Sequence, residues 1–240
     1  MKLPVPVVIT VLAVLWATGC DRLPGKPDAA GRYQRPTEIM DFTILYGQNC
    51  SGCHGAQGRL GPSRPLADPL YLAYVGSERM RQIVAHGVPG TSMPAFAESS
   101  GGTLTEEQIA ALVREIYERW GDAARVKGAL LPSYEVGATS TAGGDAAFAA
   151  FCADCHGTDG SGGEKAGSVV DPDYLALVSD QMLRTSVVVG RTDLGMPDWR
   201  EAGDRPMTPQ EITDVVTWMT ARRKAFPEAQ LPGAPGNGRN

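Results

Sequence analysis

Apolar residues recur every three or four positions in two stretches of the chain, each of which begins after a threonine. The two threonines, Thr105 and Thr208, are 103 positions apart. This spacing places the apolar side chains on one face of an α-helix. Gln108 and Glu211 follow the threonines by three residues, which is the pattern of a helix-capping box. The predicted buried faces consist of Ile109, Leu112, Val113, Ile116 and Trp120, and of Ile212, Val215, Val216 and Met219.

Other helices are predicted upstream of each of these two, again in matching pairs. Their expected ranges are 37–48 and 77–85 in the first half of the chain, and 145–151 and 179–189 in the second. Tyr46 and Phe148 each stand four residues before a cysteine and are expected to pack one helix against another. Glycine- and proline-rich loops separate the helices. The pattern therefore predicts two similar, mostly helical halves.

The N-terminus has a different pattern. An apolar run at residues 5–17 follows Lys2 and is too short to span a bilayer, which needs about 20 apolar residues. The run ends in Ala17-Thr18-Gly19-Cys20 and resembles a bacterial lipobox, although leucine is more usual at the position of Ala17. The resemblance implies removal of a signal peptide, residues 1–19, and lipid on Cys20. The alternative is an ordinary secretory signal followed by an unrelated cysteine.

Composition supports a folded protein outside the nucleic-acid-binding classes. The chain has 240 residues, of which 42% are hydrophobic and 20% charged, so it is too apolar to be disordered. Its net charge of -5 and pI near 5.3 argue against the clustered basic surface that nucleic-acid backbones need. The five cysteines form an odd number, so a disulfide framework would leave one unpaired.

Four of these cysteines belong to a motif that occurs twice. Cys50-Ser51-Gly52-Cys53-His54 and Cys152-Ala153-Asp154-Cys155-His156 both read Cys-x-x-Cys-His. This spacing is typical of covalent haem c attachment, in which two thiols one helical turn apart reach the two vinyl groups and the histidine becomes an axial iron ligand. A thioredoxin-like pair or a four-cysteine zinc site are the alternatives. A thioredoxin-like pair needs a βαβ pattern, and no β-branched strand precedes either motif. A zinc site does not explain a histidine directly after each motif.

A second pair of motifs offers the sixth ligand of each iron. Met93-Pro94 and Met196-Pro197 each end a glycine-containing loop and stand 39 and 40 residues after His54 and His156. A proline after the ligand fixes the backbone there, and His/Met ligation raises the reduction potential of a haem. His86 is the alternative to Met93 as a ligand. The remaining methionines at helical spacing are expected in the core, namely Met40, Met80, Met182 and Met219.

With these motifs in place, each half resembles a class I cytochrome c domain, and the whole resembles a dihaem cytochrome c that is a bacterial lipoprotein. The resemblance implies an all-α fold of two tandem cytochrome c-like domains, each around one covalently bound haem c with its iron. The expected division is a lipid-anchored tether at 20–35, domain 1 at 36–121, a linker at 122–143, domain 2 at 144–226 and a polar tail at 227–240.

The resemblance implies a membrane-anchored electron-transfer protein rather than an enzyme, either a free carrier or the cytochrome subunit of a larger membrane complex. Its partners would be a redox donor and acceptor, such as respiratory or photosynthetic complexes, on the periplasmic side of the cytoplasmic membrane; a soluble periplasmic protein is the alternative. A dihaem peroxidase or a thiosulfate-oxidising cytochrome is the enzymatic alternative. Such an enzyme needs a vacant or labile iron site, whereas each haem here has a methionine candidate.

Overall fold

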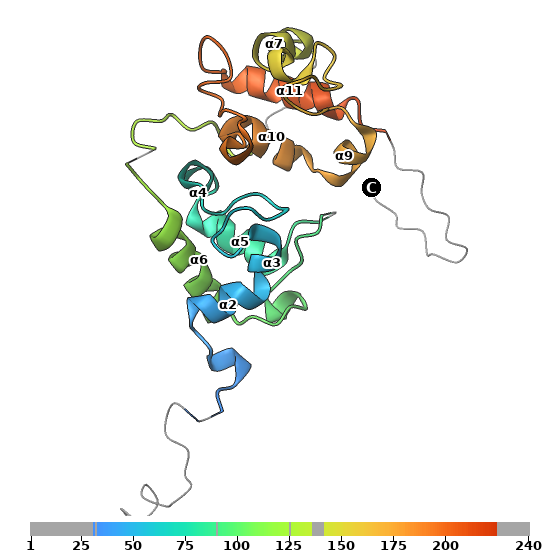
Figure 1. Cartoon of the computed structure of the whole chain (residues 1–240). Coiled ribbons are helices and arrows are strands. Elements are labelled where there is room, and N and C mark those ends of the chain that lie inside the picture. The colour runs from blue at the N-terminus through green and yellow to red at the C-terminus, as the bar shows by residue number, and fades with distance from the viewer. Residues whose placement is uncertain (1–30, 32, 90, 125, 136–141, 225–240) are drawn as a thin grey trace, which may run out of the picture. The chain divides into compact units, whose positions relative to one another are not determined.

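A computed structural model of the chain describes residues 31, 33–89, 91–124, 126–135 and 142–224 (Figure 1). The predicted signal peptide, Cys20, most of the predicted tether and the tail at 227–240 lie outside these residues. The chain divides into two units, residues 1–39 and 40–240. The described part of the first unit holds one short 3₁₀ helix, η2 (Pro36–Glu38).

Helices provide the regular structure of the second unit, and its described residues contain no strand beyond two isolated bridges. This confirms the predicted all-α class. The first half contains α2 (Phe42–Asn49), α3 (Ser51–His54), α4 (Pro69–Val75), α5 (Ser77–His86), η3 (Glu98–Ser100) and α6 (Glu106–Trp120). The second half contains α7 (Gly144–Phe151), α8 (Ala153–His156), α9 (Pro172–Leu177), α10 (Asp180–Val189), η4 (Thr192–Leu194) and α11 (Pro209–Thr220). Among the described helices, none combines the length and apolarity that a membrane span requires.

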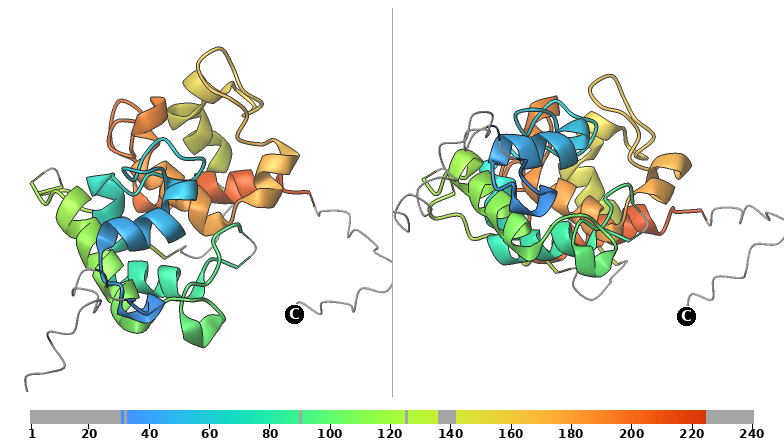
Figure 2. Two further views of the ribbon diagram at one scale, coloured as in Figure 1. Left: turned by 60° about the horizontal axis from the view of Figure 1, so that its bottom comes forward. Right: turned by 90° about the horizontal axis from the view of Figure 1, so that it is seen from below.

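In the first half, α2 packs against the closing helix α6 through aromatic rings (Figure 2, blue beside green). The ring of Trp120 meets that of Tyr46 edge-on at 5.2 Å between centroids and that of Phe42 at 5.9 Å. Ile109, Leu112, Val113 and Ile116 of α6 are buried, as the 3.6-residue pattern predicts. The predicted capping box is also present at Thr105.

The second half repeats this arrangement with α7 against α11 (Figure 1). The ring of Phe148 stacks on that of Trp218, and Ile212, Val215, Val216 and Met219 are buried. The capping box at Thr208 is present too. Tyr46 and Phe148 therefore join the first and last helices of their halves, which confirms the packing role predicted for them.

The two halves also pack on each other within the second unit. Helix α4 of the first half contacts α10 of the second. Leu70 and Tyr74 of α4 belong to the same buried cluster as Leu183 and Val187 of α10. Apolar side chains from both halves thus share one core at this contact.

Part of the connecting segment joins that core. The carbonyl oxygen of Ser133 accepts hydrogen bonds from Arg184 Nε (3.0 Å) and from the Tyr74 hydroxyl (3.1 Å). Leu131 and Tyr134 pack against the cluster, whereas Leu130 is 92% exposed. The described segment that ends at residue 135 is therefore attached to both halves.

The structure corrects some details of the predicted elements. The helix expected over 37–48 starts at Phe42, because the Asp41 carboxylate accepts the backbone N–H of Ile44 and caps it there. Helices α4 and α9 were absent from the sequence pattern, since they are too short to show periodicity. Met80 and Met219 are buried as expected, but Met40 and Met182 are exposed. Met40 precedes the α2 cap, and Met182 lies in the first turn of α10.

Candidate functional site

Each Cys-x-x-Cys-His motif folds into a single helical turn, and the two turns have the same geometry. The first cysteine of each motif leaves the preceding helix with φ near -120° and starts a four-residue helix that ends on the histidine. The backbone N–H of His54 donates to the carbonyl of Cys50 at 2.9 Å, and His156 donates to Cys152 at the same distance. The structure thus brings the two cysteines and the histidine of each motif together on one turn.

All four motif cysteines are free thiols with at least part of their surface accessible. Burial, and then the neighbouring cysteine of the motif, raises the pKa of Cys50 and of Cys152 to about 12. Both thiols are therefore protonated at neutral pH. The histidine directly after each motif, rather than the state of the thiols, favours haem attachment over a zinc knuckle.

The histidines are held in one orientation by a backbone carbonyl. Nδ1 of His54 lies 2.8 Å from the carbonyl oxygen of Arg64, and Nδ1 of His156 lies 2.8 Å from that of Gly167. Because a carbonyl only accepts, Nδ1 carries a proton in both side chains, and the neutral form of each imidazole therefore has its free lone pair on Nε2. Burial lowers the pKa of His54, partly opposed by the Arg64 carbonyl, so its imidazole is neutral. Neutral imidazole is the form that binds iron.

Each Met-Pro segment is hydrogen-bonded to the residue that follows the glycine at the end of the preceding helix. The backbone N–H of Val88 donates to the carbonyl of Met93 at 3.0 Å, and that of Arg191 donates to Met196 at 3.0 Å. Gly87 and Gly190 have φ of +70° and +72° at the starts of these loops. A Cβ on Gly87 would come within 2.7 Å of the Met93 carbonyl oxygen, and one on Gly190 within 2.6 Å of the Met196 carbonyl oxygen. Only glycine allows this approach.

Met93 and Met196 are both partly buried in these loops. The structure places each on a separate loop from its motif histidine, with matching backbone hydrogen bonds in the two halves. His86, the alternative to Met93, is exposed at the end of α5, and its Nδ1 lies 2.9 Å from the Ser100 hydroxyl.

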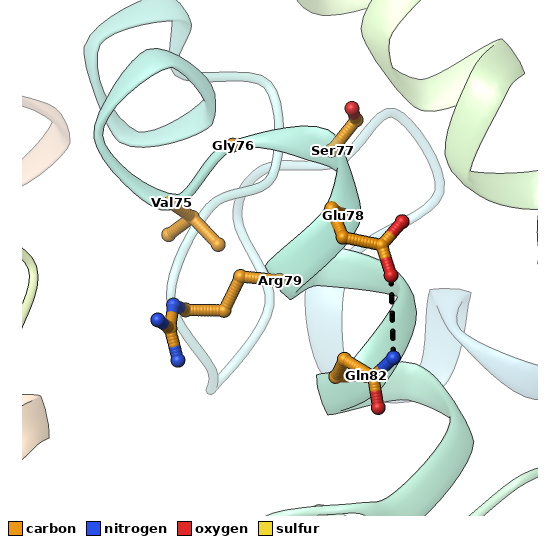
Figure 3. A pocket seen from close by; sticks show the side chains of 6 residues that line it. All are labelled: Val75, Gly76, Ser77, Glu78, Arg79 and Gln82. Carbon is orange, nitrogen blue, oxygen red and sulfur yellow. Dashed lines mark hydrogen bonds between the residues drawn. The ribbon is translucent and has the colours of Figure 1, made fainter.

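A pocket at the junction of α4 and α5 is a separate feature. It is lined by Val75, Gly76, Ser77, Glu78, Arg79 and Gln82 (Figure 3). Gln82 donates to the Glu78 carboxylate at 3.3 Å, as the dashed line shows. None of the predicted haem residues is among the lining residues.

Sequence reasoning missed Arg64, whose main chain and side chain both contact site elements. Its carbonyl holds His54, and its buried guanidinium reaches the carbonyl of Gly190 at 3.0 Å. The residue lies in a proline-containing loop that lacks periodicity, and Gly190 is 126 positions away. No local signal in the sequence points to such a contact.

The described residues fit a haem in each half. Two accessible thiols and a histidine whose Nδ1 donates to a loop carbonyl share one helical turn, which is the donor set of a c-type haem. The same set, held by the same hydrogen bonds, occurs twice in an all-α fold. These features define a c-type cytochrome with two repeated domains.

The comparisons with known proteins agree. The family model described as cytochrome c oxidase, cbb3-type, subunit III matches residues 37–114 and 139–219. The chain belongs to this family, with its cytochrome c domain present twice. Cytochrome c domains of this kind bind haem c covalently.

Two curated relatives are redox proteins by name. The chain is 40% identical over 74 residues to a dihydro-heme d1 dehydrogenase of Pseudomonas aeruginosa, covering 31% of this chain and 14% of that protein. It is 35% identical over 138 residues to a thiosulfate dehydrogenase of Stutzerimonas stutzeri, covering 52% of this chain and 43% of that protein. The chain therefore spans less than half the length of either relative.

Among solved structures, the chain is similar to one from the reducing HAO-like protein complex of Kuenenia stuttgartiensis. The TM-score is 0.44 at 18% sequence identity, covering 80% of this chain and 100% of the other. At that TM-score the likeness adds nothing to the assignment of fold or function.

Proposed function

We propose that this protein is a dihaem c-type cytochrome, anchored by lipid to the outer face of the cytoplasmic membrane, that transfers electrons between respiratory or photosynthetic complexes. When bound, each haem supplies an iron that accepts and releases one electron. The carrying observation is the twofold occurrence of one histidine geometry: Nδ1 of His54 and of His156 is held by a loop carbonyl at 2.8 Å. That geometry leaves Nε2 of both side chains free for iron.

The residues of the chain have distinct roles in this proposal. Cys50 and Cys53 form thioethers to the first haem, and Cys152 and Cys155 to the second. His54 and His156 bind the two irons on one face. Met93 and Met196 bind them on the other, and Gly87 and Gly190 let the methionine loops return close to the helix ends. A saturated iron favours electron transfer over reaction with small molecules.

Haem content tests the assignment of two sites. A pyridine haemochrome assay on the purified chain should give two haems, and the double variant C50S/C53S should give one. The matched variant C152S/C155S should also give one, with the other half still loaded. One haem in the wild-type chain would refute the dihaem proposal.

Membrane attachment is tested separately, since Cys20 lies outside the described residues. The wild-type protein should stay with washed membranes in high salt and be released by detergent. The C20A variant should appear in the soluble periplasmic fraction or remain uncleaved. Release of the wild-type protein by salt alone would contradict the lipid anchor.

Membranes that contain the wild-type protein can also be used to identify its partners. The family described as a subunit of cytochrome c oxidase favours a membrane complex as partner, either as the acceptor or as the assembly that contains this chain. Copurification from detergent-solubilised membranes should bring down a haem- or copper-containing complex. Recovery of the cytochrome alone at all detergent concentrations would indicate a free carrier.

A thiosulfate-oxidising enzyme is the second candidate, because one relative is named a thiosulfate dehydrogenase. In that case thiosulfate would supply electrons directly to the oxidised protein. We expect no reduction of the haems by thiosulfate in the absence of another enzyme. Rapid reduction, together with a high-spin haem in the resting protein, would favour the enzyme.

A further inference from the structure

Arg64 connects the two candidate haem sites through a short series of hydrogen bonds. Its carbonyl oxygen accepts the proton on Nδ1 of His54 in the first half, at 2.8 Å. Its guanidinium donates to the second half, from Nη1 to the Gly190 carbonyl at 3.0 Å and from Nη2 to the Ser186 hydroxyl at 2.7 Å. One residue therefore contacts an element of each site.

The acceptors of Arg64 stand where the methionine loop of the second half begins. Ser186 lies in the last turn of α10, and Gly190 is the residue at which that helix ends. The next residue, Arg191, exchanges two backbone hydrogen bonds with Met196, each of 3.0 Å. The Gly190 backbone also lies directly against Met196 and Pro197, so a shift of Gly190 moves the loop.

Burial makes these hydrogen bonds costly to break. Arg64 is only 8% exposed, and its side chain lies over the ring of Tyr71 at 5.6 Å. Asp68 of the first half and Asp193 of the second supply opposite charge nearby, while Arg191 supplies like charge. A buried guanidinium that lost its acceptors would leave a charge without hydrogen bonds, which is strongly unfavourable.

The two halves differ at this position, which separates the two roles of the residue. In the second half, the carbonyl that holds His156 belongs to Gly167, which has no side chain. A carbonyl alone therefore suffices to orient the histidine. The Arg64 side chain is an addition of the first half, and its acceptors lie 122 and 126 positions further along the chain.

We propose that Arg64 is a positioning residue for both haem sites, with its main chain fixing the iron-binding histidine of the first site and its side chain fixing the methionine loop of the second. The inference rests on the proposed function, because it assigns the two elements to haem sites. It predicts that the side chain of a residue in the first domain controls the properties of the second haem.

The test replaces the side chain and keeps the carbonyl. R64M retains length and apolar packing but removes every donor, while R64K retains the charge and one donor nitrogen. R79M is the matched control, because the Arg79 guanidinium pairs with Glu135 instead of with Gly190. Haem content is measured first in the wild type and in each variant, followed by backbone hydrogen exchange and by potentiometric titration.

In R64M we expect two haems per chain and exchange in residues 186–197 that is faster by about tenfold or more, which corresponds to one lost charged hydrogen bond. The potential of the second haem should shift, and that of the first should change less, because the carbonyl at position 64 remains. R64K should restore part of both effects, and R79M should match the wild type.

Two other results would overturn the inference alone. Both apply to variants that hold two haems. In the first, R64M has the exchange rates and the potentials of the wild type; in the second, R64M and R79M change them equally. If R64M does not fold, S186A serves instead: it removes one acceptor of Arg64, and an unchanged exchange rate in residues 186–197 would refute the proposal. A wild-type protein with fewer than two haems would refute the proposed function instead.

Discussion

The indole ring of Trp218 stacks on the phenyl ring of Phe148, with 4.0 Å between the ring centroids and 16° between the ring planes. Trp218 lies on α11, and its indole N–H also donates to the Asp145 carboxylate at 2.5 Å. The guanidinium of Arg222, just after that helix, lies 3.4 Å from the centroid of the indole ring. This contact joins the first and last helices of the second half. Phe148 is four residues before Cys152, so the contact also positions the start of the second haem motif.

Replacing Trp218 with alanine should therefore destabilise the second half. A buried tryptophan truncated to alanine loses about 3–5 kcal/mol of unfolding free energy, because its apolar contacts are lost and a cavity remains. Denaturant unfolding followed by far-UV circular dichroism measures the change. Y33A is the control, since Tyr33 is 84% exposed and its truncation should change stability by less than about 0.5 kcal/mol. A W218A protein as stable as Y33A would contradict this role.

The same tryptophan shows why the sequence predicts the helices better than their contacts. Trp218 is ten residues after Thr208, whereas Trp120 is fifteen residues after Thr105, so the two do not align in the repeat. A Cβ on Gly58 would still touch the ring of Trp120, at 2.9 Å, and one on Gly160 would come within 3.0 Å of Trp218. Capping boxes and periodicity are local and visible in sequence. The position of an aromatic ring is not visible in this way when the ring reaches the equivalent contact from another turn of the helix.

The candidate site likewise has parts that the sequence predicts and parts that it does not. The cysteines, the histidines and the methionine loops follow from short motifs whose spacing carries the chemistry, and the structure places the first two on one turn. The carbonyls that orient the histidines come from Arg64 and Gly167, ten and eleven positions downstream. Carbonyl contacts depend on the path of the loop and not on residue type. The Arg64 side chain depends on packing between the two halves, which no local pattern encodes.

The capping box of α11 predicts a pH dependence, because Glu211 stands where the capping box of α6 has Gln108. Hydrogen bonds from Arg205, at 2.6 and 2.9 Å, and from Thr208 lower the pKa of Glu211 to about 2. The unfolded chain has the ordinary glutamate pKa near 4.5, so it binds more protons than the folded chain between these values. Glu211 thus stabilises the fold above about pH 5, and this contribution is lost as the pH falls toward 2.

The variant E211Q isolates that contribution, because Gln108 occupies the same capping position in the first half. The variant should be less stable than the wild type at pH 7 by about 1 kcal/mol or less, since Arg205 is 57% exposed. The difference should shrink as the pH falls from 5 to 2. Unfolding midpoints measured across that range check it, and a difference that grows in acid would contradict the assignment.

An ion pair beside the second methionine loop predicts a change in potential. Arg191 donates two hydrogen bonds to Asp193, at 2.9 and 2.8 Å, and this interaction lowers the pKa of Asp193. D193N leaves the positive charge of Arg191 unbalanced. Because positive charge favours the reduced haem, the potential of the second haem should rise by tens of millivolts, roughly the effect of one partly screened charge at about 10 Å.

The opposite variant gives the matching control. R191Q leaves the negative charge of Asp193 unbalanced, and the potential of the second haem should fall. The double variant R191Q/D193N should return close to the wild type, because the pair is neutral. Potentiometric titration of the three proteins checks the signs. A shift of the same sign in both single variants would show that loop structure, not charge, sets the potential.

The last prediction concerns the sixth ligand. With Met93 and Met196 both on iron, the oxidised protein should show the near-infrared sulfur-to-iron band of two low-spin haems, and M93A and M196A should each lose about half of it. The potential of the affected haem should fall, because the thioether stabilises reduced iron. Both haems should stay attached, since the thioethers to cysteine do not depend on the sixth ligand.

M207A is the matched control: Met207 is buried in the core of the second half, so its truncation should cost about 2–5 kcal/mol of stability and leave the band intact. A wild-type band of half the expected strength that M93A leaves unchanged would assign the first iron a ligand without sulfur, with His86 the residue to replace next. A high-spin haem that binds cyanide rapidly in the wild-type protein would instead leave an iron open for chemistry, and the second candidate function would then apply to that half.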